Sequence, residues 1–306
     1  MRVVTLSMCS LFWACSGEST TPEPEDQVLQ VYSFSYPVSY LVERLAEGAV
    51  EHDCILPAGE DAASWKPSNE LIIELQQADV LFSNGLGFEG WVKTAALPTS
   101  KLIEAASTVD PIRMEGKTHS HGKGGAHSHG EIDPHAWSDP QTYGQMASVV
   151  AKALIKADPS LETSVQANLE SLQQDLNTLH KDYTTVLQGL KTATFAANHP
   201  SFSYLMRAQG LEITSFDFDP EGDLDAKELE KFTTWTTTHP NPLVLWEAEP
   251  NDSVQSHAAF VNAKHFFIDP LEGPVDGKFD YVAQVKANQE RFQAIVTTTI
   301  TTPEAP

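Results

Sequence analysis

Five of the 11 histidines in this chain lie between His119 and Pro140, in a stretch that reads HSHGKGGAHSHGEIDPHAWSDP. Imidazole is a favoured ligand of zinc and other borderline cations, and its neutral form is available near neutral pH because its unperturbed pKa is ~6.5. The types and spacing of these residues therefore predict metal binding.

The stretch has two parts with different physical properties. In the first, a loop at residues 117–131, small and polar residues surround four histidines, so we expect a mobile segment that binds metal loosely or not at all. These accessory histidines are His119, His121, His127 and His129. The second part, Asp133–Trp137, reads DPHAW, and its proline-fixed turn is a rigid setting for one ligand, His135.

The overall composition is that of an acidic globular protein. Its 306 residues are enough for roughly two domains, and 41% of them are hydrophobic. The formal net charge of −23 argues against nucleic acid as a partner, because the phosphate groups would be repelled. An acidic surface attracts cations, although acidity alone is common on solvated surfaces.

The first residues are typical of a secretion signal. A basic start precedes an apolar run that ends at Ala14-Cys15 and is too short to span a bilayer. Because this end resembles a lipobox, we expect cleavage before Cys15 and lipidation of its thiol; the alternative is an uncleaved or ordinarily processed signal. Residues 1–15 are thus assigned to the signal and residues 16–27 to a disordered tether.

Two successive alternations of strands and helices follow, and each indicates an α/β lobe whose parallel sheet is covered by helices on both faces. The N-terminal lobe covers residues 28–157, with strands expected at 28–35, 50–56, 79–83 and 101–103 and helices at 36–47, 69–77 and 142–157. The C-terminal lobe covers residues 191–300, with strands at 194–198, 212–216, 243–247 and 265–268 and helices at 201–209, 225–238, 253–263 and 281–298. Residues 301–306 are expected to be a disordered tail.

One long helix is predicted between the lobes, at residues 158–190. Its apolar residues recur every three or four positions from Leu161 to Leu190, so one face is buried along the whole length. At 1.5 Å per residue the helix would be about 45 Å long. We therefore expect a rigid spine that joins the two lobes.

Polar residues gather just beyond the carboxyl ends of the predicted strands, where ligands of open α/β sheets bind. They are His199, Glu249 and Asp269 in the second lobe and Glu60 or Asp61 in the first. Two facing lobes would bring these groups together with His135 around a shared cleft. Around that cleft we expect Glu247 to orient an imidazole through its other nitrogen, and Trp65 and Trp137 to exclude water.

A glycine-rich segment, Gly85–Gly90, matches the GxGxxG pattern of dinucleotide-binding turns. Pro98 breaks the helix that would follow, and the match does not lie in the first βαβ unit. We therefore do not interpret it as a nucleotide site.

Together these features resemble a known family, the zinc- and manganese-binding solute-binding proteins of metal ABC importers. The resemblance covers essentially the whole chain after the tether and is carried by the His-rich loop, the spine helix and several short motifs. These motifs are NGLGFEGW (84–91), DPHAW (133–137), NHPSF (198–202), LWEAEP (245–250) and IDPLEG (268–273). It implies two Rossmann-like lobes joined by one long helix, and it explains the glycine-rich segment as a family motif.

The resemblance also implies a set of four metal ligands. It assigns His135, His199 and Asp269 to three of them. In the family, the first ligand is a histidine in another DPH motif. In this chain Ala63 stands at that position and cannot coordinate a metal, so the first ligand is missing.

Several interpretations of that vacancy are open. Asp61 or Glu60 would supply an oxygen; a water molecule or a loop histidine would complete the site; or the cleft binds something else. Oxygen-rich coordination would broaden selectivity toward Mn²⁺ or Fe²⁺. Zn²⁺ is the expected ligand, because His-rich loops accompany the zinc-specific members of the family.

The resemblance implies a lipid-anchored monomer in the periplasm or on the outer side of the membrane. It would capture a divalent metal between the lobes and deliver it to a membrane permease. A manganese- or iron(II)-selective binder, a zinc-dependent hydrolase and a metal buffer are the alternatives. The chain lacks the HExxH and GxSxG motifs, so we predict that it is not an enzyme.

Overall fold

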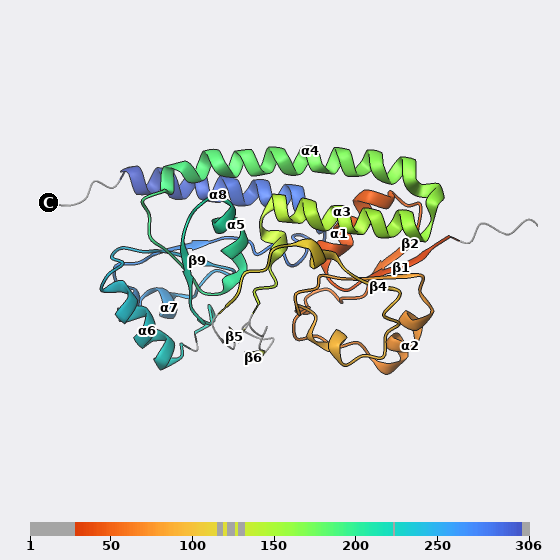
Figure 1. Cartoon of the computed structure of the whole chain (residues 1–306). Coiled ribbons are helices and arrows are strands. Elements are labelled where there is room, and N and C mark those ends of the chain that lie inside the picture. Colours follow the sequence, from red (N-terminus) through yellow and green to blue (C-terminus); the bar gives the residue numbers. More distant parts are fainter. Residues whose placement is uncertain (1–27, 115–118, 121–125, 128–131, 223, 302–306) are drawn as a thin grey trace, which may run out of the picture.

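The computed structural model describes residues 28–114, 119–120, 126–127, 132–222 and 224–301. Two α/β lobes lie side by side beneath a layer of long helices (Figure 1). The predicted signal with Cys15, the tether, residues 302–306 of the predicted tail, and the loop histidines His121 and His129 lie outside the described residues, whereas Thr301 ends the last helix.

The N-terminal lobe is built on a four-stranded parallel sheet in the order β2-β1-β3-β4. Its strands are β1 (Gln30–Ser33), β2 (Glu51–Cys54), β3 (Val80–Ser83) and β4 (Leu102–Glu104), and its helices are α1 (Tyr36–Ala46), α2 (Asn69–Gln77) and α3 (Pro140–Ala157). All four residues of β3 are buried, as expected for an inner strand with both faces covered.

The C-terminal lobe repeats the arrangement with a parallel sheet in the order β10-β9-β7-β8. Its strands are β7 (Phe195–Ala197), β8 (Ile213–Ser215), β9 (Leu243–Trp246) and β10 (Lys264–Phe267), and its helices are α5 (Ser203–Ala208), α6 (Ala226–Thr236), α7 (Asp252–Gln255) and α8 (Tyr281–Thr301). The predicted fold of two parallel sheets flanked by helices is confirmed.

The helix expected at residues 253–263 is shorter than predicted. It ends as α7 at Gln255, and a separate 3₁₀ turn begins at Ala258. His257 causes the break, because its backbone is extended (φ −63°, ψ 137°) and its side chain accepts a hydrogen bond from the Ala259 N–H.

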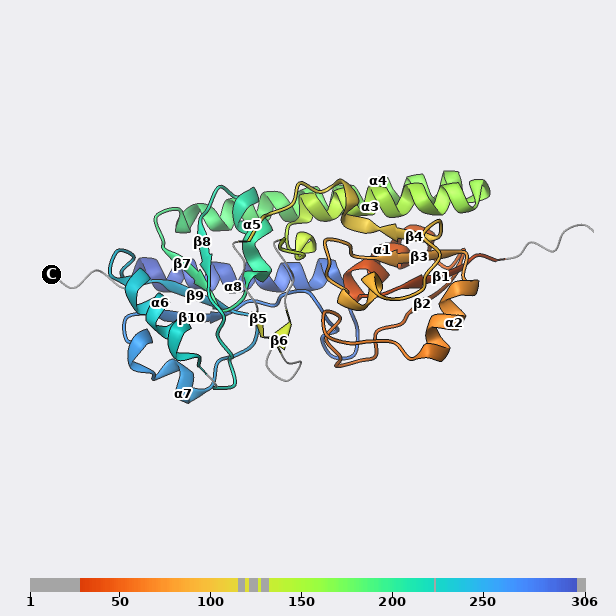
Figure 2. The ribbon, with the colours of Figure 1, turned by 60° about the horizontal axis from the view of Figure 1, so that its bottom comes forward.

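The long helix between the lobes is also confirmed. Helix α4 (Glu162–Leu187) continues at both ends into 3₁₀ turns, Pro159–Leu161 and Gln188–Leu190. It is not isolated, because α3 and α8 run beside it in both views (Figures 1 and 2). No helix in the described part of the chain is long and apolar enough to cross a membrane.

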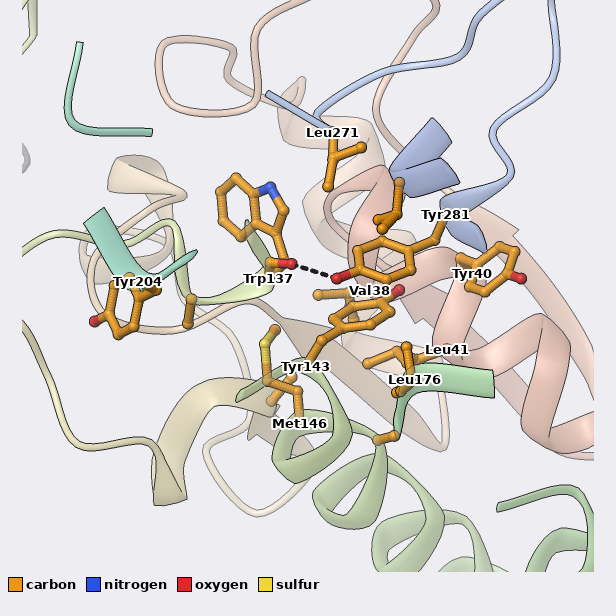
Figure 3. Close-up of a cluster of buried hydrophobic side chains, with 14 of the residues drawn as sticks. Val38, Tyr40, Leu41, Trp137, Tyr143, Met146, Leu176, Tyr204, Leu271 and Tyr281 are labelled. Atoms are coloured by element: carbon orange, nitrogen blue, oxygen red, sulfur yellow. Dashed lines mark hydrogen bonds between the residues drawn. The ribbon is translucent and has the colours of Figure 1, made fainter. Parts of the chain in front are cut away.

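The two lobes share one hydrophobic core, which continues beneath α4. At the lobe boundary Tyr143 of α3 stacks on Tyr281 of α8, with ring centroids 3.9 Å apart. Figure 3 shows these rings packed with Leu41 and Trp137 from the first half of the chain and Leu271 from the second. The lobes are therefore packed as a unit rather than joined only by the spine.

Two short strands, β5 (His119–Ser120) and β6 (Ala126–His127), come from the predicted His-rich loop. They pair antiparallel and lie between the lobes on the side away from α4 in both views (Figures 1 and 2). The rest of the predicted loop lies outside the described residues.

Candidate metal site

His135 is held by the turn that the DPHAW motif predicts. Asp133 Oδ1 accepts a hydrogen bond from the His135 backbone N–H at 2.9 Å and lies 2.7 Å from His135 Nδ1. The backbone carbonyl of Pro134 accepts a hydrogen bond from the side-chain amide of Asn84, which follows β3. A carboxylate on one imidazole nitrogen fixes the ring and directs Nε2 away from the turn, as in many metal sites.

The glycine-rich segment builds the wall beside this histidine. Gly85, Leu86 and Gly87 all have positive φ angles, of 86°, 54° and 81°, and the resulting tight loop presents Phe88 to the site. The Phe88 ring centroid lies 4.7 Å from that of Trp137 and 6.0 Å from that of His135. Only a four-residue 3₁₀ helix follows, so the segment lacks the long helix of a dinucleotide-binding turn.

Glu89 anchors the same loop from inside the lobe. Its buried carboxylate accepts hydrogen bonds from the Ser35 hydroxyl and the Asn84 backbone N–H, at 3.0 and 2.9 Å. Burial raises the pKa of Glu89 to about 7, although these hydrogen bonds oppose the shift. The loop that carries Phe88 is thus fixed to the ends of β1 and β3.

His199 comes from the other lobe and meets His135 at the boundary. It follows β7 with an extended backbone (φ −148°, ψ 156°) and begins the 3₁₀ turn Pro200–Phe202. Its ring centroid lies 5.1 Å from that of His135, with the two rings at 90°. Both imidazoles are buried, so the structure brings together the two histidines that the sequence predicts as ligands.

Glu272 was not among the predicted residues, yet its carboxylate reaches His135. Its Oε1 lies 3.4 Å from His135 Nε2, and 22% of its side chain is exposed. Two ligand atoms at about 2.0–2.1 Å from a tetrahedral zinc are about 3.3 Å apart, so this separation fits two ligands of one ion. Glu272 lies in the same IDPLEG motif as Asp269, which was the only signal in the sequence.

Asp269, a predicted ligand, supports the loop that carries Glu272. One of its carboxylate oxygens accepts a hydrogen bond from the Leu271 N–H at 2.8 Å, and the other accepts from the Gln284 side chain at 3.0 Å. Its backbone N–H and carbonyl both bond to the side chain of Asn288 on α8.

The other predicted carboxylates differ in their exposure and in the hydrogen bonds that they accept. Glu60 and Glu249 are exposed. Asp61 forms its own turn, because its Oδ1 accepts a hydrogen bond from the Ala63 N–H at 2.9 Å. Glu247 accepts a hydrogen bond from the Ser201 hydroxyl at 3.1 Å.

The two predicted tryptophans and the other histidines lie in different surroundings. Trp137 adjoins His135, with ring centroids 5.1 Å apart, whereas Trp65 packs edge-on to Trp91. The five histidines that lie outside the His-rich stretch, apart from His199, contact other groups. These groups are Ser33 for His52, Asp139 for His180, Trp235 for His239, Ala259 for His257 and Trp246 for His265.

The charges around His135 favour its protonated form. Burial alone would lower the pKa of His135, but the charge of Asp133, its hydrogen bond to the ring and the nearby Glu272 outweigh burial and raise the pKa to about 10. A cation at Nε2 would replace that proton and meet the same negative surroundings. Within the described ranges, no three His, Cys, Asp or Glu side chains already form a complete group of ligands for a metal ion.

Comparison with known proteins identifies the relatives of the chain. The profile of the family described as zinc-uptake complex component A periplasmic (ZnuA) matches residues 31–295. The high-affinity zinc uptake system protein ZnuA of Bacillus subtilis is 24% identical over 280 residues, which are 88% of this chain and 87% of that protein. The zinc-binding lipoprotein AdcA of Streptococcus pneumoniae is 23% identical to this chain in an alignment that covers 89% of the chain. The same alignment covers 55% of the length of that relative.

Solved structures of similar fold include the Zn(II)-bound ZnuA-like domain of Streptococcus pneumoniae AdcA. The two structures match with a TM-score of 0.71 and 20% sequence identity. The matched region covers 89% of this chain and 99% of that domain. The metal-dependent lipoprotein YcdH of Bacillus subtilis has a TM-score of 0.70 at 22% identity, over 87% of this chain and 99% of that chain. These similarities confirm the fold of two parallel sheets with a long helix.

Proposed function

Because the chain belongs to the zinc-uptake complex component A family, we propose that it captures Zn²⁺ at the lobe boundary and delivers it to the permease of an ABC importer. Membership of this family confirms the prediction that the protein is a metal-binding transport component and not an enzyme. The observation that carries the proposal is the pair of buried imidazoles, His135 and His199, with the Glu272 carboxylate beside them.

The proposed ligands are His135 Nε2, one imidazole nitrogen of His199 and the Glu272 carboxylate. The separation of 3.4 Å between His135 and Glu272 suits two corners of a zinc tetrahedron, and a small rotation of the His199 ring would supply a third corner. A water molecule would take the fourth, because Ala63 offers no donor and Asp61 uses one carboxylate oxygen, Oδ1, within its own turn.

Zinc suits this ligand set better than Mn²⁺ or Fe²⁺. Imidazole nitrogens are ligands of borderline cations, whereas harder cations prefer sites made largely of oxygen. Because both Asp269 oxygens accept hydrogen bonds that hold its loop, the ligand set that we propose contains one protein carboxylate rather than two.

The family and the start of the sequence support an extracytoplasmic setting. The family is described as periplasmic, and the AdcA relative is named a lipoprotein. We propose an extracytoplasmic monomer that is anchored through Cys15 and binds a membrane permease. The accessory histidines of the loop at residues 117–131 would bind further ions weakly.

Native mass spectrometry of the processed protein, with Zn²⁺ and Mn²⁺ in competition, tests the proposal. We expect one tightly bound zinc in the wild type and its loss in His135→Ala and His199→Ala. Deletion of residues 119–129 should remove only weakly bound ions. Retention of the tight zinc by both histidine variants would refute this site.

A further inference from the structure

Trp137 contacts both segments that carry the proposed ligands. It follows His135 by two residues in the chain, and its indole N–H donates a 3.0 Å hydrogen bond to the backbone carbonyl of Pro270. Pro270 lies two residues before Glu272 in the loop after β10. One hydrogen bond therefore joins the His135 turn to the Glu272 loop across the lobe boundary.

The backbone of Trp137 is also fixed. Its carbonyl accepts a 2.7 Å hydrogen bond from the hydroxyl of Tyr281, the first residue of α8 (Figure 3). The Tyr281 ring stacks on Tyr143 of α3, and both rings are fully buried. The Trp137 ring is itself buried against Phe88, so the indole cannot reorient without disturbing the core.

The Glu272 loop is attached to α8 at both of its ends. The Gln284 side chain donates hydrogen bonds to Asp269 Oδ2 and to the Gly273 carbonyl, both at 3.0 Å. Between these points Leu271 adopts a left-handed backbone with φ of 61°, which is strained for a residue with a branched side chain. The Trp137 hydrogen bond to Pro270 holds the loop immediately before this strained residue.

We propose that Trp137 is a positioning residue that fixes the distance between His135 and Glu272 and thereby sets the rate at which the metal is released. This inference rests on the proposed function, since it assumes that both residues are ligands. Moving the Glu272 loop away from the His135 turn requires the indole hydrogen bond to break. Release of zinc to a partner would therefore begin with separation of Trp137 from Pro270.

Trp137→Phe tests the proposal, because it removes the N–H and keeps an aromatic ring. Trp91→Phe is the matched control: Trp91 is also buried, but its indole nitrogen has no hydrogen-bond partner among the described residues. Transfer of zinc from the loaded protein to an excess of chelator gives the dissociation rate. We expect release to be about tenfold faster in Trp137→Phe, the effect of losing one buried hydrogen bond, and unchanged in Trp91→Phe.

The absorption spectrum of the Co²⁺-loaded protein separates positioning from ligation. It should be the same in the wild type and Trp137→Phe, because the ligands are intact. Tyr281→Phe, which removes a single hydroxyl, gives a second and milder test if Trp137→Phe folds poorly, and it should also accelerate release.

Equal release rates in Trp137→Phe and Trp91→Phe, or an unchanged rate in Tyr281→Phe, would overturn the inference while leaving the proposed function intact. A wild-type protein that takes up no zinc would instead overturn the proposed function and this inference with it.

Discussion

At the scale of single residues, each ring nitrogen of His135 faces a carboxylate. Nδ1 lies 2.7 Å from Asp133, and Nε2 lies 3.4 Å from Glu272. The raised pKa favours an imidazole with a proton on both nitrogens when no metal is bound. Metal binding must therefore release the proton on Nε2.

Zinc binding should accordingly become tighter as the pH rises. Between about pH 7 and pH 9 we expect a gain of about tenfold per pH unit from His135 alone, because its proton competes with the metal up to the raised pKa. Titration calorimetry in buffers of different ionisation enthalpy should detect about one proton released per zinc. Asp133→Asn removes the largest influence that raises this pKa and should reduce the release; a wild type that releases no proton would contradict the assignment.

The same proton stabilises the protein without metal. Since the pKa of His135 is raised above the unfolded value of ~6.5, its contribution is complete below about pH 6.5 and is lost as the pH rises toward 10. Bound zinc would offset that loss, because it binds only the folded site.

Glu272 and Glu249 form a matched pair of carboxylates at the carboxyl ends of neighbouring strands. Glu272→Gln keeps the size of the side chain but removes its charge, so we expect zinc affinity to fall at least tenfold, which is ~1.4 kcal/mol. Glu249→Gln should leave the affinity unchanged, since this side chain is exposed. Competition with a chelator of known affinity measures both, and the opposite ranking of the two variants would refute the choice of Glu272.

The sequence patterns predicted both histidines as ligands but did not predict Glu272. Asp269 and Glu272 are three residues apart in one loop, and between them Leu271 has a left-handed backbone with φ of 61°. A leucine in that conformation is not predicted by any local pattern, because such φ values are expected of glycine and asparagine. Asp269 accepts one hydrogen bond from Leu271 within the loop, but its bonds to Gln284 and Asn288 come from α8, which lies outside the loop.

At the scale of elements, the Gly85–Gly90 loop shows why a motif needs its surroundings. Gly85 has a φ of 86°, and a Cβ there would lie 2.9 Å from the Cβ of Glu104 on β4. Gly48, after α1, has a similar φ of 81° but no atom within 4 Å of such a Cβ. The left-handed backbone thus favours glycine at both positions. At position 85 the Glu104 side chain also leaves too little room for a Cβ.

Gly85→Ala should therefore destabilise the protein more than Gly48→Ala. Each alanine incurs the cost of a left-handed backbone, about 1–2 kcal/mol, and Gly85→Ala adds a steric clash worth roughly 1–3 kcal/mol. Urea unfolding of the two variants measures the difference. Equal losses of stability would show that the Gly85 loop is less tightly packed than the structure indicates.

Most strands and helices were predictable because their patterns are local. Helix α2 begins at the residue after Ser68, whose side chain accepts a hydrogen bond from the Leu71 N–H, and the predicted bounds agree with the structure. The break at His257 was not predictable, because a histidine that caps a turn resembles any other polar residue in a helical pattern. The packing of α3 and α8 against α4 could not be predicted, because no local sequence pattern specifies which helices lie together in the fold.

At the scale of the whole molecule, the two lobes act as one packed body. The shared core and the helices α3, α4 and α8 cross or border the lobe boundary, so wide opening would expose much apolar surface (Figure 1). The sequence predicted two lobes and a spine, but not how closely they pack. Trp137 and Pro270, which are 133 positions apart, meet through the fold and not through any pattern along the chain.

The central claim is that zinc binds between the lobes to His135, His199 and Glu272. The most direct measurement is anomalous diffraction at the zinc edge from crystals of the zinc-loaded protein. We predict a single strong peak about 2 Å from His135 Nε2, a nitrogen of His199 and an oxygen of Glu272. A strong peak coordinated by other residues, with none between these three side chains, would contradict the proposed site.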